Sequence, residues 1–207
     1  YQMGLAYLLL KEQQQAKAAF MEAIRLQPNN IRARELLADI YMRSRSYDLA
    51  QKEALSILKV SPRNIHAHLI LGDVALANQN GSEAIRAYKN VIAFSPESPS
   101  GYLRLGIVMR LMKKDKEALV LFEKTLSTHP EEVDALVQIA AIYLHQNNAK
   151  AAISRVDQQI AITPKNSSFY HLKAKIYLKN NDKKNAEQNF KRAIEFNSND
   201  MASYLAL

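Results

Sequence analysis

The sequence predicts an all-α solenoid of antiparallel helix pairs, because three features recur every 34 residues. The first is proline, which stands at positions 28, 62, 96, 130 and 164. The other two are an alanine slot and a slot for a small residue, filled by Ala16, Ala50, Ala84, Ala118, Ala152 and Ala186, and by Gly4, Ala38, Gly72, Gly106, Ala140 and Ala174. Small residues let two helix backbones approach closely, and proline ends a helix. Such a fixed period is typical of stacked repeats that share a continuous core.

The stretch 99–132 shows the repeating unit. Its two apolar stripes have helical spacing and consist of Tyr102, Leu105, Met109 and Met112, and of Ala118, Leu121, Phe122 and Thr125. The polar run Lys113-Lys114-Asp115 between them predicts a tight turn. The unit is therefore expected to be a helix, a turn and an antiparallel helix.

In chain order, residues 1–30 are a repeat without its first four positions, and full repeats follow at 31–64, 65–98, 99–132, 133–166 and 167–200. Residues 201–207 begin a further first helix, in which Tyr204 and Leu207 are expected to cover the preceding pair. The predicted N-caps are Asn30, Asn64, Ser98, Asn166 and Asp200, with Glu132 the weak one. We expect 1–207 to form a single solenoid domain and to be a fragment of a longer protein. Its uncapped ends favour end-to-end self-association.

Composition argues against most catalytic chemistry. There is no cysteine, so disulfides and thiolate sites are excluded. The five histidines form no metal-ligand motif, and neither a phosphate-binding glycine loop nor a serine nucleophile elbow is present. We therefore expect no catalytic, cofactor-binding or metal-binding residue, no small-molecule substrate and no enzyme activity. No apolar run is long enough to span a bilayer, and both the cytoplasm and the bacterial periplasm stay open as compartments.

The unit resembles the tetratricopeptide repeat (TPR). The first repeat carries the pattern in Met3, Gly4, Tyr7, Ala16, Phe20, Ala23 and Pro28, and the last full repeat carries it in Tyr170, Ala174, Tyr177, Ala186, Phe190 and Ala193. Departures are Ala54 and Val156 at the aromatic slot, Thr125 at the second alanine slot, and Lys173 at an apolar slot. The resemblance implies a right-handed superhelical solenoid whose first helices line a concave groove.

Carried over position by position, the resemblance implies a partner-binding groove formed by Arg32, Glu35, Asp39, Leu69, Asp73, Leu103, Ile107, Arg110, Val137, His145, His171, Lys175 and Lys179. This groove has mixed charge at one end, is apolar in the middle and is basic at the other end. That arrangement suits an extended or helical peptide. The sequence leaves open whether Leu103, Ile107 and Val137 contact a ligand or pack against neighbouring helices. The residue sets of the TPR carboxylate clamp and asparagine ladder are not matched.

The formal net charge of +8 raises nucleic acid as a rival partner. Residues 165–200 carry eight Lys/Arg against four Asp/Glu, but acidic residues are interleaved with the basic ones, which favours a solvated face. We therefore expect a noncatalytic scaffold or adaptor for a protein or peptide partner, similar to bacterial TPR proteins of envelope assembly, exopolysaccharide export or protein sorting. The alternatives are the partner-recruiting region of a larger enzyme, such as a glycosyltransferase, and then a nucleic-acid-binding solenoid.

Overall fold

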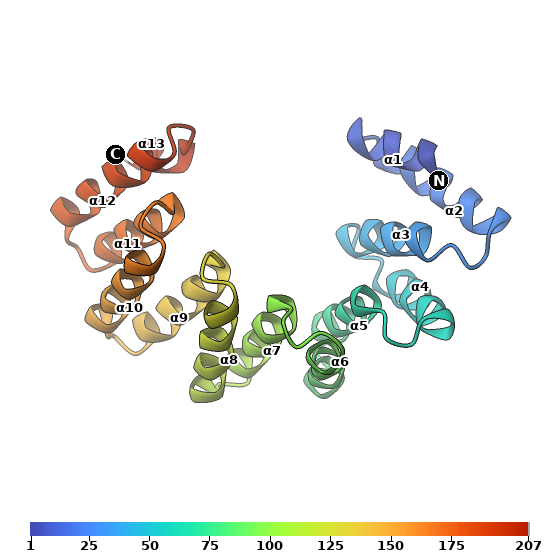
Figure 1. Cartoon of the computed structure of the whole chain (residues 1–207), viewed down its shortest axis with the longest axis horizontal. Helices are drawn as coiled ribbons and strands as arrows, with labels where there is room; N and C mark the ends of the chain where they lie inside the picture. Colours follow the sequence, from blue (N-terminus) through green and yellow to red (C-terminus); the bar gives the residue numbers. More distant parts are fainter. Residues whose placement is uncertain (207) are drawn as a thin grey trace. The chain divides into compact units, whose positions relative to one another are not determined.

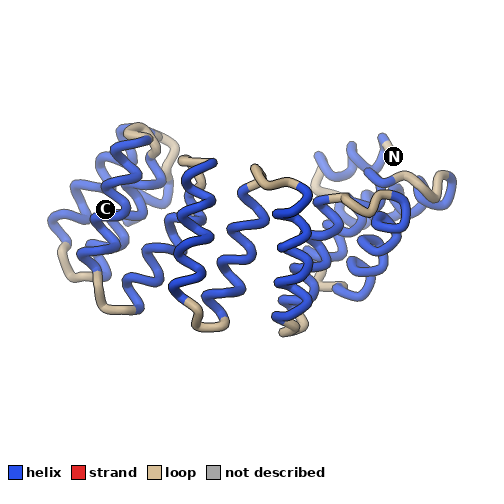
Figure 2. The backbone as a smooth tube through the Cα atoms, turned by 60° about the horizontal axis from the view of Figure 1, so that its bottom comes forward, coloured by secondary structure: helices blue, strands red, loops and turns tan. Residues whose placement is uncertain are grey.

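The computed structural model describes residues 1–206, which form helices joined by short loops and contain no strand (Figure 2). The first helices of the repeats are α1 (Gln2–Leu9), α3 (Ile31–Arg43), α5 (Ile65–Ala77), α7 (Pro99–Leu111), α9 (Val133–His145), α11 (Ser167–Lys179) and α13 (Met201–Ala206). The second helices are α2 (Gln13–Leu26), α4 (Tyr47–Val60), α6 (Gly81–Phe94), α8 (Asp115–Thr128), α10 (Ala149–Ile162) and α12 (Lys183–Phe196). The predicted all-α solenoid of helix pairs is confirmed (Figure 1). Leu207, expected to cover the preceding pair, lies outside the described residues.

The helices keep the period of the sequence. The five complete first helices, α3, α5, α7, α9 and α11, have 13 residues each and begin at the first residue of a repeat. The six second helices have 14 residues each. Each helix therefore presents the same positions to its neighbours from one repeat to the next.

Side-chain caps begin most first helices as the sequence predicts. The side-chain oxygens of Asn30, Asn64 and Asn166 accept hydrogen bonds from backbone N–H groups of α3, α5 and α11, at 3.0, 2.8 and 3.1 Å. Glu132 makes no cap hydrogen bond, in agreement with its weak ranking. Asn80 is itself the N-cap of α6 and Gly81 its first residue, so the Asn-Gly pair lies at the end of the turn between helices.

The turn between the two helices of each repeat contains one left-handed residue that is never glycine. These residues are Lys11, Arg45, Gln79, Lys113, Asn147 and Asn181, with φ between 56 and 62°. In the turn at Arg45, the Arg45 N–H donates to the Met42 carbonyl at 3.1 Å and the Ser46 N–H donates to the Tyr41 carbonyl at 2.8 Å. These two hydrogen bonds form a Schellman motif.

The left-handed turn also corrects the predicted stripe of the first helix in 99–132. Because Lys113 takes this conformation, α7 ends at Leu111, and Met112 is 46% exposed instead of joining the apolar face. Asp115 belongs to α8, whereas the sequence placed it in the turn.

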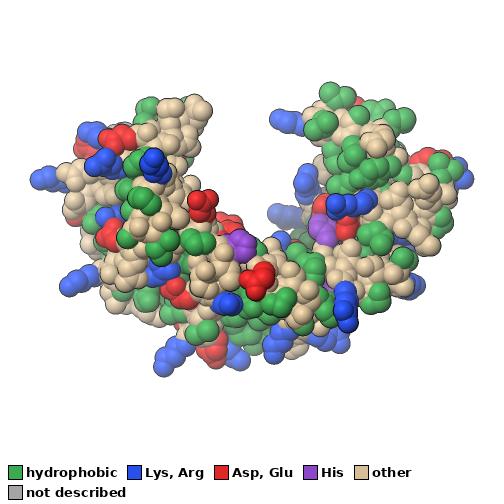
Figure 3. All heavy atoms as spheres, viewed as in Figure 1, with side chains coloured by type: hydrophobic (Ala, Val, Ile, Leu, Met, Phe, Trp, Pro, Cys, Tyr) green, Lys and Arg blue, Asp and Glu red, His purple; other side chains and the backbone are tan. Residues whose placement is uncertain are grey.

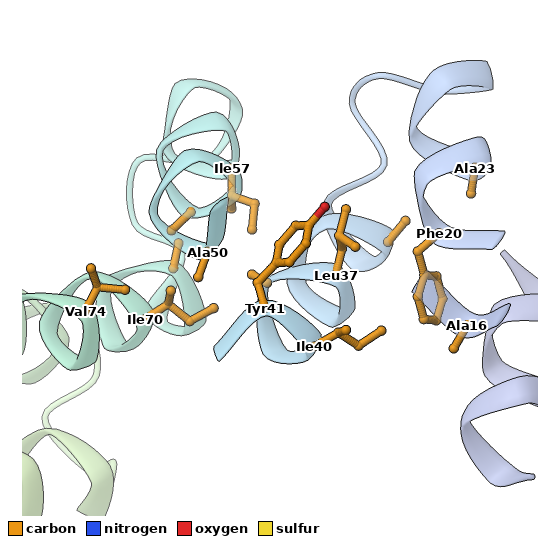
Figure 4. Close-up of a cluster of buried hydrophobic side chains, with 14 residues drawn as sticks. Ala16, Phe20, Ala23, Leu37, Ile40, Tyr41, Ala50, Ile57, Ile70 and Val74 are labelled. Carbon is orange, nitrogen blue, oxygen red and sulfur yellow. The ribbon is translucent and has the colours of Figure 1, made fainter. Parts of the chain in front are cut away.

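The chain comprises two compact units, residues 1–101 (unit 1) and 102–207 (unit 2). In unit 1, a core cluster runs from Ala16 and Phe20 on α2 to Ile70 and Val74 on α5 (Figure 4). In unit 2, a second cluster runs from Ala118 on α8 to Ile176 on α11. Within each unit, helices adjacent in sequence pack together, and so do the neighbouring first helices α3 with α5 and α9 with α11.

The small slot faces the aromatic slot of the same repeat. A Cβ atom added to Gly4, Gly72 or Gly106 would meet a ring atom of Phe20, Tyr88 or Phe122 at 2.2 to 2.5 Å. Where the small slot holds Ala38 or Ala140, the opposite residue is Ala54 or Val156. These departures from the aromatic pattern are thus compensated across the helix pair; Ala174 opposite Phe190 is an exception.

A buried polar link joins two repeats of unit 2. Gln159 is 1% exposed at the second alanine slot; its amide nitrogen donates to the Pro130 carbonyl at 2.6 Å, and its oxygen accepts from Arg155 at 3.0 Å. Arg155 also binds both carboxylate oxygens of Glu123 on α8, at 2.7 and 2.8 Å. Gln159 is a further departure from alanine at this slot, and its hydrogen bonds fix α10 against the preceding repeat.

Candidate partner-binding faces

The thirteen groove residues, which were selected by their position in the TPR unit, all lie on first helices. We call this selection the position rule. Five of them, Arg32, Glu35, Asp39, Leu69 and Asp73, belong to unit 1 and lie on α3 and α5. The other eight belong to unit 2, on α7, α9 and α11. We call these two sets the unit 1 face and the unit 2 face.

Glu35 is the centre of a polar network on the unit 1 face. It is 8% exposed, and its carboxylate pairs with Arg32 at 3.2 Å. The same carboxylate accepts a hydrogen bond at 2.9 Å from the side-chain amide of Asn64, whose oxygen caps α5. Glu35 therefore connects the body of α3 to the start of the next first helix.

The other two carboxylates of this face are also engaged. The ring nitrogen Nε2 of His66 lies 2.9 Å from Oδ1 of Asp39, and both side chains are partly exposed. The buried Tyr88 hydroxyl donates to Oδ1 of Asp73 at 2.6 Å. Leu69 is half-buried between them along α5. On the unit 1 face, the predicted charged residues thus interact within the fold.

The apolar members of the unit 2 face are half-buried. Leu103, Ile107 and Val137 pack against the core cluster of unit 2 and still expose part of their surface. Partial burial is compatible with both alternatives that the sequence leaves open, packing and ligand contact.

A pocket of about 310 Å³ brings three predicted residues of the unit 2 face together, namely Val137, His171 and Lys175. Its remaining lining consists of Val133, Ser167, Ser168, Leu172, Asn197, Asp200 and Ala202. The valine and leucine side chains give it an apolar wall, whereas Lys175 is exposed and forms no ion pair within residues 1–206. This arrangement can hold an apolar side chain beside an anionic group.

His171 is fixed at the pocket by the last described helix. Its Nδ1 lies 2.7 Å from the Ser203 hydroxyl, which donates to Asp200 at 2.6 Å. The hydroxyl proton points to Asp200, so the Nδ1–H group of His171 is the donor to Ser203. Ser203 is fully buried in this chain of hydrogen bonds, so the trio positions α13 and does not form an accessible nucleophile.

The pKa values of this trio move in line with its surroundings. Burial lowers the pKa of the His171 imidazole; the Asp200 charge opposes that shift and the Lys175 charge adds to it. Burial acts to raise the pKa of Asp200, but hydrogen bonds from Ser203 and the charge of His171 outweigh it and lower that pKa. His171 is therefore neutral at pH 7 while Asp200 is charged.

The remaining basic members of the unit 2 face lie outside the pocket. His145 and Lys179 are the exposed last residues of α9 and α11, where a cation also complements the helix dipole. Arg110 is half-buried in the last turn of α7, and its Nε atom is buried without a hydrogen-bond partner within residues 1–206.

The surface charge is dispersed. Figure 3 shows Lys and Arg side chains scattered over the visible face, with Asp and Glu among them. Within 165–200, three of the basic residues are paired, in Lys173–Asp157, Lys191–Glu187 and Arg192–Glu195. Within the described residues there is no group of three or more His, Asp or Glu placed to hold a metal, and no helix with the length and apolarity for a membrane span.

Models of the tetratricopeptide repeat match residues 1–30, 35–99, 112–176 and 167–200, and so account for most of the chain. The chain belongs to the tetratricopeptide-repeat family. TPR units generally mediate protein–protein interaction and are generally noncatalytic. Comparison with curated proteins finds no match.

Solved TPR proteins share the fold of this chain at low sequence identity. PilW, described as a type IV pilus biogenesis factor, is 17% identical with a TM-score of 0.73, over 99% of this chain and 94% of its own. PilF of Pseudomonas aeruginosa is 20% identical with a TM-score of 0.70, over 99% and 93%. YrrB, a TPR protein with an unusual peptide-binding site, is 16% identical with a TM-score of 0.57, over 91% and 97%.

Two groups of residues at the pocket of the unit 2 face were not among those selected by repeat position. Ser168 occupies the same repeat position as Arg32, so the rule itself could have selected it. Asp200 and Ser203 act through the docking of α13 on α11, and the only local signal for that docking is the helix cap at Asp200. Tyr204, expected to cover the last pair, is half-exposed, and Ser203 is the buried residue instead.

Apolar side chains are exposed on the first and last helices. Leu9 on α1 and Leu205 on α13 are more than four-fifths exposed, at 86 and 84%. End-to-end self-association through these helices stays a prediction.

Proposed function

We propose that this TPR chain is a noncatalytic adaptor that binds an extended segment of a partner protein on its first-helix faces, with the pocket of the unit 2 face as the anchor. The proposal rests on the observation that Val137, His171 and Lys175 line the same pocket, which has a volume of about 310 Å³. This volume lies at the lower end of the range of about 300–1,000 Å³ that is typical of ligand-binding pockets.

The chemistry of the pocket favours an apolar residue next to an acidic one. Val133, Val137 and Leu172 offer the apolar wall, and the Lys175 ammonium is available for a carboxylate. The carboxylate of Asp200 already accepts a hydrogen bond from Ser203, so it competes less for Lys175. Exposed Lys179, one helical turn beyond Lys175, extends the basic surface for a further acidic residue.

A displayed library of random peptides tests this proposal. We expect the chain to enrich peptides in which Leu, Ile or Val neighbours Asp or Glu, and Val137→Glu to reduce their binding at least tenfold. The matched control is Val120→Glu, because Val120 is 70% exposed on the second helix α8. Circular dichroism checks that both variants remain equally helical.

A charge reversal tests the acidic preference separately. Lys175→Glu is expected to shift the enriched peptides from acidic to basic residues, whereas Lys116→Glu on α8 leaves the selection unchanged. Peptides that bind Val137→Glu as well as the parent chain would contradict the proposed anchor. Peptides without any charge preference would leave an apolar anchor and remove the role of Lys175.

A further inference from the structure

One first helix, α5, lacks the large residue that five other first helices carry at the equivalent position. The equivalent positions hold Tyr7, Tyr41, Met109, Tyr143 and Tyr177, whereas α5 has Ala75. Ala75 is 5% exposed and is one of the residues that line a cleft in unit 1.

Tyr41 shows what a tyrosine does at this position. Its side chain is almost fully buried in unit 1, where it is labelled among the core residues in Figure 4. Its hydroxyl reaches the Met21 sulfur, on the second helix of the preceding repeat, at 3.9 Å. A shift by one repeat maps Met21 onto Leu55 and Tyr41 onto Ala75.

The cleft beside Ala75 has a volume of about 570 Å³ and lies between α4, α5 and α6 of unit 1. Leu55, Leu58 and Leu71 give it an apolar lining, and Leu55 is 46% exposed. Gln51 and Asn90 place carboxamide groups in the lining, and neither makes a side-chain hydrogen bond within residues 1–206. Glu83 and Arg86 complete the polar side of the lining. The cleft thus combines an apolar leucine wall with a polar rim.

We propose that this cleft is a binding site for a tyrosine side chain presented by a partner protein. The guest ring occupies the space that Tyr41 fills in the preceding repeat, against Leu55 and Ala75. Its hydroxyl reaches the carboxamides, as a tyrosine in an apolar pocket requires. Tyrosine side chains seated in desolvated pockets are frequent anchors of protein interfaces.

This site is separate from the unit 2 face. Most of its lining comes from the second helices α4 and α6 and from α5, within residues 51–90. The chain then has two independent contact surfaces, as an adaptor needs in order to hold two partners.

Binding of p-cresol and N-acetyl-tyrosinamide, followed by amide chemical shifts in NMR, tests the proposal. We expect saturable shifts at Leu55, Ala75 and Asn78, all in the cleft lining, and none with N-acetyl-alaninamide. Shifts that do not saturate, or that lie outside residues 51–90, would overturn it.

Two opposite variants sharpen the test. Ala75→Tyr fills the cleft from within, and is expected to weaken p-cresol binding at least tenfold and to raise the melting temperature. Tyr41→Ala opens the equivalent space beside Met21 and is expected to create a second p-cresol site there.

A third variant keeps the test decisive if either of these fails to fold. Leu55→Lys places a charge at a half-exposed wall, and is expected to remove binding without a change in helicity. Unchanged binding in Leu55→Lys or in folded Ala75→Tyr would overturn the proposal. Val137→Glu is expected to leave p-cresol binding intact, so the two proposed sites fail or succeed separately.

Discussion

The unit 1 and unit 2 faces use the same repeat positions for different purposes. On the unit 1 face, Glu35, Asp39 and Asp73 each accept a hydrogen bond or an ion pair from within the fold. On the unit 2 face, Lys175 and Lys179 are exposed beside a pocket with an apolar wall. The position in the repeat therefore selects residues that can face a partner. The hydrogen bonds and ion pairs within the chain show which of these side chains are already engaged.

The largest change in stability is expected at the buried polar link of unit 2. This link involves the second helices and lies away from the unit 2 face. Gln159→Ala restores the family residue at that slot but leaves the Pro130 carbonyl without its donor and Arg155 without one acceptor. We expect a loss of about 2–3 kcal/mol in the free energy of unfolding, measured in urea. Gln158→Ala, at the exposed neighbouring residue, is the control and should change it by less than about 0.5 kcal/mol.

The next effect compares the faces directly. Glu35→Ala removes a nearly buried acceptor of Arg32 and Asn64, and we expect it to cost about 1–2 kcal/mol of unfolding free energy. Lys175→Ala should change the same quantity by less than about 0.5 kcal/mol, because its side chain is exposed. Equal losses in the two variants would remove the distinction between the faces.

A smaller effect should be the same in both units. Arg45→Gly in unit 1 and Lys113→Gly in unit 2 relieve a left-handed conformation that residues with a Cβ atom adopt at a cost. We expect each to raise the free energy of unfolding by about 0.5–1 kcal/mol in thermal or urea melts. A gain in one unit alone would show that the units differ in their turns as well as in their faces.

The smallest effect is the pH dependence of His171, which is still partly exposed. Its pKa is lower in the folded chain than in the unfolded chain, so the unfolded chain binds more protons as the pH falls below the ordinary histidine value of about 6.5. Stability is expected to decline on acidification through that range. His171→Asn, which keeps an N–H donor for Ser203, should reduce that part of the decline, whereas an unchanged pH profile would contradict it.

Much of the fold follows from the sequence because the period is exact in the helices themselves. The prolines and small residues predict where Ile31 begins α3 and which residues share a face. The left-handed turns left no signal, because Lys113 and Arg45 stand where glycine would have marked them. Here the hydrogen bonds of the Schellman motif offset a preference that the residue type alone opposes.

The candidate sites were less predictable, since a missing side chain matters only if nothing replaces it. The ring of Tyr88 fills the space beside Gly72, whereas Ala75, three residues later, lines a cleft. Likewise, His171 was selected by position, while its hydrogen bond to Ser203 depends on a helix that begins thirty residues further on. Such pairings depend on tertiary packing and have no local pattern.

The packing between helices close in sequence has a kinetic consequence. Within each unit, a contact closes a loop of little more than one repeat, as α3 does with α5 and α9 with α11. Loops of that length close quickly, so helix pairs can form early and independently. Amide hydrogen exchange should accordingly show opening repeat by repeat, fastest at α13, instead of one concerted event for the whole chain.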